Sequence, residues 1–140
     1  MAMTYGYIYV AQVALGANKQ QYLTALTKAE AYDGPSLIIA YSTCIAHGMN
    51  MVNSMDEQKR AVDCGYWTLY RFNPMLKEQG KNPLILDSKA PTADFQTFLA
   101  GENRFASLKK SAPQDAERLY QQLEQEQKER RALYEKLAQL

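Results

Sequence analysis

The residues from Tyr7 through Leu15 form an almost unbroken run of aromatic, β-branched and small apolar side chains. Such a run is typical of a β-strand that is covered on both faces. A second short apolar run, from Ser36 through Tyr41, follows the turn residues Gly34 and Pro35. It meets the same criteria of length and flanking residues. The two runs therefore predict two strands of one sheet.

Between these runs the sequence predicts a helix from about Lys19 to Tyr32. Asn18 is a favourable N-cap, and Gln21 follows it three residues later. Two strands joined by a helix should pair in parallel, so their carboxyl ends, at 15–17 and 42–44, should share the edge where open α/β sheets bind ligands. The expected buried stripe of the helix consists of Tyr22, Leu23, Leu26, Ala29 and Glu30.

One such unit supplies only two parallel strands and cannot cover both faces of them. We therefore expect the C-terminal part of a larger α/β domain, cut from a longer polypeptide or completed by another subunit. The alternative is that later segments of the chain contribute the missing strands. These segments predict one or two helices over 49–64, strands over 65–72 and 84–87, a helix from about 92 with Phe95, Phe98 and Leu99 buried, and a short helix with Phe105 and Leu108.

The tail from Ser111 predicts a long amphipathic helix that opens with a capping box. The pairs Glu124–Lys128 and Glu126–Arg130 have the spacing of helical ion pairs. Between Leu123 and Ala132 every residue is Glu, Gln, Lys or Arg, which interrupts the apolar seam. We therefore expect the helix to pack on its own protein rather than to form a coiled coil.

The balance of charges excludes some classes of partner. Lys and Arg number 16 against 15 Asp and Glu, a formal net charge of +1, so no global field attracts nucleic acid. No apolar run reaches the roughly 20 residues that span a bilayer, and the N-terminus lacks the pattern of a signal peptide. We expect a cytoplasmic protein of one domain's size without a membrane or nucleic-acid partner.

The candidate reactive residues are Cys44, His47 and Cys64. Cys44 closely follows the second strand, where a thiolate could be a nucleophile, a redox thiol or a metal ligand; the alternative is an inert buried cysteine. His47 could serve Cys44 as a base, although a structural histidine is the simpler interpretation. Cys64 precedes a strand, which favours a structural role. Two cysteines and one histidine cannot complete a four-ligand site, and the expected compartment argues against a disulfide.

Four segments closely resemble the end of the pyruvate:ferredoxin (flavodoxin) oxidoreductases, and the resemblance extends through nearly the whole chain. They are Ala2–Asn18, Ala29–Tyr41, Cys44–Gly48 and Lys59–Trp67. The resemblance implies an α/β fold. Residues 1–74 would be the C-terminal part of a thiamine-diphosphate-binding domain with a doubly wound, mainly parallel sheet, and residues 75–140 a mostly helical C-terminal extension.

The resemblance also implies a role for Cys44 as the last in sequence of four cysteines that hold a 4Fe-4S cluster near the thiamine. The other three, and the Gly-Asp-Gly and Asn-containing segments that bind the diphosphate and magnesium, are absent from this sequence. The family usually has Pro at the position of Thr43. In the full enzyme, implied to be a homodimer, pyruvate is decarboxylated oxidatively to acetyl-coenzyme A, and electrons pass through 4Fe-4S clusters to ferredoxin or flavodoxin.

We therefore expect this chain to be inactive alone, to bind no cluster tightly, and to act with the remainder of the parent enzyme. Two other functions are compatible with parts of the sequence. A small helical interaction or scaffold protein would explain the charged tail. A single-thiol redox enzyme would use Cys44 and His47.

Overall fold

The computed structural model describes the whole chain except the side chain of His47. Its strands are β1 (Tyr9–Val13), β2 (Ser36–Ala40), β3 (Tyr70–Phe72) and β4 (Leu84–Leu86). Its α-helices are α1 (Lys19–Ala31), α2 (Ser54–Asp63), α3 (Met75–Glu78), α4 (Phe95–Gly101), α5 (Asn103–Ser111) and α6 (Pro113–Gln139). Short 3-10 turns are η1 (Ala2–Tyr5), η2 (Ile45–His47) and η3 (Met51–Asn53).

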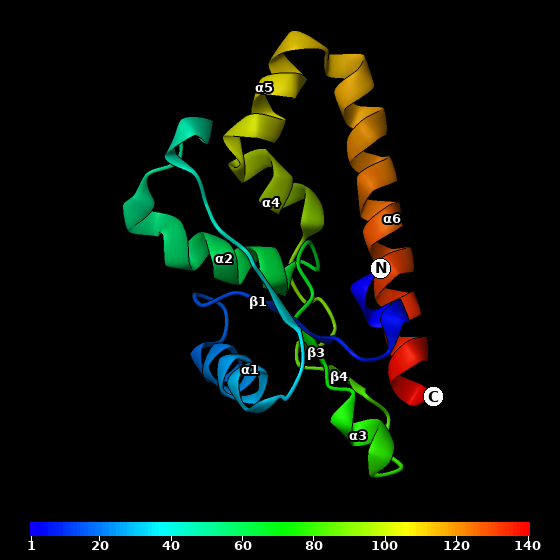
Figure 1. Ribbon diagram of the computed structural model, residues 1–140. Helices are drawn as coiled ribbons and strands as arrows, with labels where there is room; N and C mark the ends of the chain where they lie inside the picture. Colours follow the sequence, from blue (N-terminus) through cyan, green and yellow to red (C-terminus); the bar gives the residue numbers. More distant parts are fainter.

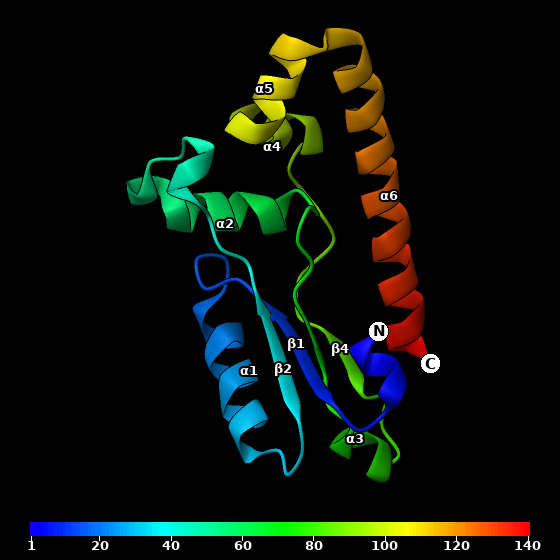
Figure 2. The same cartoon turned by 45° about the horizontal axis from the view of Figure 1, so that its top comes forward.

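The four strands form one mixed sheet in the order β2-β1-β3-β4 (Figure 2). β1 pairs in parallel with β2, from Tyr9 opposite Ser36 to Val13 opposite Ala40. On its other side β1 pairs antiparallel with β3, which pairs antiparallel with β4. The structure therefore confirms the α/β class, the parallel pair and the helical extension. Later segments do add strands beside β1, but all of them lie on one side, and β2 remains an edge strand.

β1 is buried on both faces, as the apolar run predicts. Tyr9, Ala11 and Val13 pack with Ala25 of α1, whereas Val10 on the opposite face packs with residues of β3 and β4. β2 differs, because Leu37 is 43% exposed and no residue of this strand is fully buried. The described part of the chain therefore leaves the apolar side chains of β2 partly exposed.

The beginning of α1 is as predicted, whereas its buried face agrees with the prediction only in part. Asn18 Oδ1 accepts a hydrogen bond of 2.9 Å from the backbone N–H of Gln21. Tyr22 and Ala29 of the expected stripe pack partly buried against the core, whereas Leu23, Leu26 and Glu30 are exposed. The fully buried residues are instead Gln21 and Ala25. The small Ala25 lets the helix approach β1 closely enough for the Tyr9 hydroxyl to donate to the Ala25 carbonyl.

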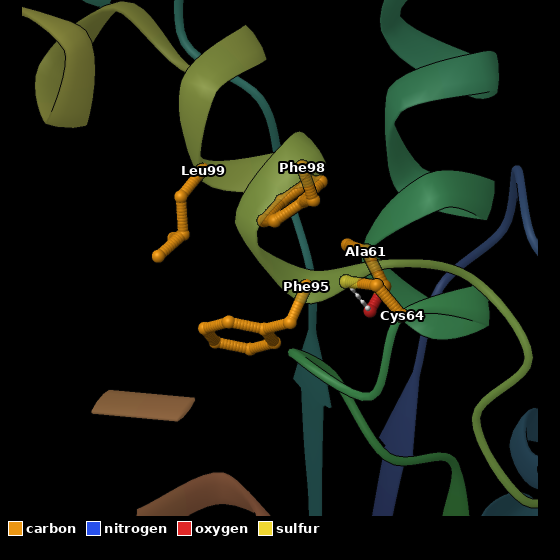
Figure 3. Packing of buried hydrophobic residues seen from close by; sticks show 5 residues of the cluster. All are labelled: Ala61, Cys64, Phe95, Phe98 and Leu99. Carbon is orange, nitrogen blue, oxygen red and sulfur yellow. Dashed lines mark hydrogen bonds between the residues drawn. The ribbon is translucent and has the colours of Figure 1, made fainter. Parts of the chain in front are cut away.

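In the middle of the chain, fewer residues form a β-strand than the alternation of apolar and polar residues over 65–72 predicts. Only Tyr70–Phe72 of the expected strand over 65–72 is paired, because the backbone N–H of Trp67 bonds to the Ala61 carbonyl and turns the chain back on α2. The two short helices expected over 49–64 are present as η3 and α2. The predicted stripe of α4 is buried in a cluster with Ala61 and Cys64 of α2 and its C-terminal cap (Figure 3); it consists of Phe95, Phe98 and Leu99.

α6 runs back along the molecule from α5 towards the sheet, so that both termini lie at the same end (Figure 1). It packs on α4, α5 and β4, and the ring of Tyr134 lies 5.1 Å from that of Tyr70. Packing on its own protein is therefore confirmed. No described helix has the length and apolar character needed to cross a membrane.

Two details of the tail differ from expectation. The capping box is wrong, because Ser111 closes α5 by donating to the carbonyls of Ser107 and Leu108, and α6 begins with Pro113 in its first turn. The Glu124–Lys128 pair forms at 2.9 Å. Glu126 instead accepts a hydrogen bond from Gln122.

The packing of α6 on the sheet predicts unequal effects for two adjacent residues. Tyr134→Ala removes a ring that covers Tyr70, and we expect it to lower the free energy of unfolding by about 1–3 kcal/mol. Leu133→Ala, at a position 53% exposed, should change it by less than about 0.5 kcal/mol. Urea denaturation of the two variants measures the difference, and equal midpoints would contradict the packing.

Candidate functional site

The carboxyl ends of β1 and β2 lie at one edge of the sheet. The backbone N–H of Tyr41, just after β2, donates to the carbonyl of Val13, the last residue of β1, at 2.9 Å. The loop after β1 meets α2 here, because the N–H of Gly16 donates to Gln58 Oε1 at 2.9 Å. The predicted edge is therefore present, and α2 lies against it.

Gly16 is required by this contact. A Cβ atom at position 16 would lie 2.4 Å from the Met55 carbonyl oxygen, closer than any real contact between such atoms. The backbone of α2 cannot retreat without losing the hydrogen bond from Gly16 to Gln58. A side chain at position 16 would therefore separate the β1 loop from α2.

Cys44 lies in the loop after β2, in extended backbone at the start of η2. Its thiol is free and the residue is exposed. The preceding residue is held in place, since Thr43 Oγ1 lies 2.5 Å from Ser54 Oγ and 3.8 Å from Met51 Sδ. Further along the loop, the N–H of Gly48 closes the turn on the Ile45 carbonyl; φ at Gly48 is +77°, and a Cβ there would meet the Asn103 amide at 2.4 Å. The loop thus presents the Cys44 thiol to its surroundings from a defined backbone.

Cys64, unlike Cys44, is buried. It is 5% exposed, and its thiol donates to the Ala61 carbonyl at 3.4 Å inside the cluster of Figure 3. Burial raises the pKa of Cys64 to about 11, against the smaller opposing effect of the Tyr66 backbone amide. These surroundings support the structural interpretation of Cys64. The backbone of His47 lies in η2. The interpretation of its side chain stays a prediction, because that side chain lies outside the described part of the chain.

Glu57 of α2 and Glu102, at the junction of α4 and α5, lie together behind the Cys44 loop. No feature of the sequence indicates that they would meet. Glu57 and Glu102 line, with Gly48 and Asn103, a cavity of about 210 Å³. The pKa of Glu102 is raised, first by burial and then by its contact with the Glu57 carboxyl group. Burial also raises the pKa of Tyr41, and the charge of Glu102 adds to this effect. Sequence reasoning missed this pair because its members are far apart in the chain.

The side chains at this edge offer few ligands for a metal ion. Within the described residues, no group of three or more His, Cys, Asp and Glu side chains could hold a metal ion. Cys44 can offer a single exposed sulfur, and a 4Fe-4S cluster takes four thiolates. One cysteine sulfur can therefore fill at most one of the four ligand positions of such a cluster.

The close approach at Gly16 can be tested by adding a methyl group. We expect Gly16→Ala to lower the free energy of unfolding by about 1–3 kcal/mol, because α2 must shift away from the β1 loop. Gly101→Ala is the matched control: nothing lies within 4 Å of the new methyl group, and the change should be neutral or stabilising by up to about 1 kcal/mol. Urea titration measures both variants, and an unchanged midpoint for Gly16→Ala would exclude the contact.

The two cysteines should differ in reactivity. In the folded chain at pH 8 iodoacetamide should alkylate Cys44 only, because Cys64 is buried and fewer than about one in a hundred of its thiols is ionised. Alkylation of Cys64 should rise about tenfold per pH unit towards pH 11 while the fold persists. Mass spectrometry of the peptides gives the two rates, and Cys44→Ser should leave no fast thiol. Equal rates at pH 8 would contradict the buried position of Cys64.

Comparison with known proteins gives the chain close relatives, although no protein-family model matches it. It is 58% identical over 138 residues to a pyruvate:ferredoxin oxidoreductase of Moorella thermoacetica and 58% identical over 140 residues to a pyruvate-flavodoxin oxidoreductase of Enterobacter agglomerans. Each match covers 99% of this chain and 12% of the relative. A mitochondrial pyruvate dehydrogenase [NADP(+)] of Euglena gracilis is 46% identical over 125 residues, 88% of this chain and 7% of that protein.

The chain thus spans about 12% of the length of the first two relatives, and the identity extends over both the sheet and the helical tail. The resemblance found in the sequence is therefore confirmed. This chain is homologous to one segment of the pyruvate:ferredoxin/flavodoxin oxidoreductase family.

Proposed function

We propose that this chain is the C-terminal segment of a pyruvate:ferredoxin/flavodoxin oxidoreductase, in which Cys44 is one of four thiolate ligands of a 4Fe-4S cluster. The observation that carries the proposal is the exposed, free Cys44 at the carboxyl edge of the parallel strands, in a chain 58% identical to such enzymes. When bound, the cluster would accept and pass on single electrons.

The role of this chain's residues is to hold that ligand in position. The family usually has Pro at the position of Thr43, which would fix the backbone before the cysteine. Here the Thr43 hydroxyl contacts Ser54 Oγ and Met51 Sδ, so that side-chain contacts constrain the same loop. The edge strand β2 offers a free row of backbone groups to further strands of the parent sheet.

The remaining features follow from the parent enzyme. Thiamine diphosphate and magnesium would bind to other segments of it, residues 1–74 would complete its thiamine-diphosphate-binding domain, and residues 75–140 would form the extension. The parent would be a cytoplasmic homodimer that oxidises pyruvate to acetyl-coenzyme A, and the isolated chain would be inactive. The names of the relatives include ferredoxin, flavodoxin and NADP(+), so similarity to them does not specify the electron acceptor.

The alternative of a small helical interaction protein is less well supported. A docking helix needs a free apolar face, whereas the face of α6 that carries Tyr134 and Ala138 packs on the sheet. Outward positions of α6 carry charged residues in ion pairs, such as Lys128 with Glu124, interspersed with exposed leucines such as Leu133. The helix therefore behaves as part of the packed extension.

Replacing each cysteine in the full-length parent enzyme tests the proposal. We expect Cys44→Ala to lose one cluster, about four irons per protomer, and electron transfer to the acceptor, while thiamine binding is retained. Cys64→Ala is the matched control and should keep a full set of clusters. Iron analysis and low-temperature EPR measure both variants. A full iron content in Cys44→Ala, with a cluster lost in Cys64→Ala, would refute the assignment.

A further inference from the structure

Two carboxyl groups meet between α2 and the junction of α4 with α5. The side chain of Glu57 is 7% exposed and that of Glu102 is 11% exposed. Both line the cavity of about 210 Å³, together with Arg60 and three asparagine residues. Glutamate side chains are rarely buried without full compensation of their charge, so a buried pair of them requires a physical explanation.

The arginines beside the pair compensate the two glutamates unequally. Arg60 Nη1 lies 3.2 Å from Glu57 Oε2, which is a hydrogen-bonding distance. Arg104 Nε lies 3.7 Å from Glu102 Oε2, which is too long for a hydrogen bond. Arg104 instead donates to the hydroxyl of Tyr66 at 3.2 Å. Glu102 is therefore the less well compensated member of the pair.

Glu102 also has an oxygen atom that lacks a donor. Its Oε1 is buried and accepts no hydrogen bond from the described residues. Ionised carboxyl groups can only accept hydrogen bonds, so two ionised glutamates cannot bond to each other, whereas a proton on one of them supplies a donor. Burial raises the pKa of Glu102, and its hydrogen bond with the Glu57 carboxyl group raises it further, against smaller opposing effects of Arg104 and Tyr41.

We propose that Glu57 and Glu102 share one proton in the folded chain, and that this proton joins α2 to the α4–α5 junction. Loss of the proton would place two negative charges together where little water can screen them, and their repulsion would oppose the contact. The pair is therefore a pH-sensitive contact between two parts of the fold. The inference does not depend on the role proposed for Cys44.

Titratable and charged groups face the pair from several elements. They are Arg60 on α2, Cys64 at the C-terminal cap of α2, Tyr41 in the loop after β2, and Arg104 on α5 with Tyr66 beside it. Arginine, tyrosine and buried cysteine side chains ordinarily keep their charge state between pH 4.5 and 8. Histidine ordinarily titrates in this range, and His47 is the one histidine of the chain, so the test requires a variant without it.

Urea unfolding of the 140-residue chain between pH 4.5 and 8 tests the shared proton. The ordinary pKa of glutamate is 4.5, so above this pH the unfolded chain loses the proton that the folded chain keeps. The stability that it contributes is complete below pH 4.5 and is lost as the pH rises through the raised pKa. Glu102→Gln replaces the carboxyl group by a neutral amide that can still donate to Glu57. The unfolding constant of the wild type, divided by that of Glu102→Gln, should therefore rise by up to about tenfold per pH unit and then level off.

Two backgrounds separate the pair from other groups. With Glu57→Gln present in both chains, the same ratio should rise much less, because Glu102 no longer has a carboxylate with which to share a proton. With His47→Gln present in both chains, the ratio should rise as it does without that substitution.

Two spectroscopic measurements follow the proton without comparing stabilities. Carbon-13 NMR of the glutamate carboxyl groups should give Glu102 a titration midpoint above 4.5 in the wild type, and Glu102→Gln identifies its resonance. Trp67 is the one tryptophan of the chain, and the centre of its ring lies 5.5 Å from that of Tyr41. Its emission should move to longer wavelength as the wild type loses the proton, and should stay unchanged in Glu102→Gln.

Three results would overturn the inference. One is a ratio that stays constant or falls as the pH rises, since Glu102 would then be ionised in the folded chain and held by Arg104. Another is an NMR midpoint for Glu102 at or below 4.5. The third is a rise that disappears with His47→Gln and persists with Glu57→Gln, which would assign the pH dependence to the histidine. None of these results bears on the cluster, which is tested separately by Cys44→Ala.

Discussion

The parallel pairing of β1 with β2 determines where the rest of the chain can lie. Parallel strands end at the same edge, so the loops that contain Gly16 and Cys44 leave the sheet side by side. α2 lies against this edge, and the missing side chain at Gly16 lets it approach. The Cys44 loop then rests on α2 through Thr43 and Ser54. The position of Cys44 at this edge of the sheet is thus a consequence of strand direction.

A polar network attaches the antiparallel part of the sheet to α1 and α6. Arg71 of β3 makes two hydrogen bonds to Asp87, at 2.9 and 3.0 Å, and these bonds raise the pKa of the Arg71 guanidinium group. Gln21 donates to the same carboxylate, and Arg131 of α6 donates to the hydroxyl and carbonyl of Ser88. Because these groups are largely buried, loss of one partner would leave another unsatisfied. The network therefore holds the extension in one position on the sheet.

The same network shows where prediction from the sequence ends. The first strand, the parallel pair and the Asn18 cap depend on local sequence, and all three were predictable. The buried face of α1 was predictable only in part, because Gln21 points inward to donate to the Gln12 carbonyl and to Asp87, which lies 66 positions away. The strand over 65–72 was overestimated for a similar reason: the backbone N–H of Trp67 donates to the Ala61 carbonyl, and only its indole N–H reaches the carbonyl of Val13 in β1. The position of Cys44 after a strand was visible in the sequence, whereas the Glu57–Glu102 contact required the fold.

The distribution of charge distinguishes two kinds of surface on this chain. The net charge of +1 conceals an uneven arrangement, since the ionised side chains avoid residues 34–55 and are frequent on α6. α6 pairs its charges along its own outer face, as Glu124 does with Lys128, and needs no further partner to remain hydrated. The loop around Cys44 has no such means of interacting with water. Burial of that loop in a larger assembly would remove its exposed apolar side chains from water and would enclose the Cys44 thiol with them.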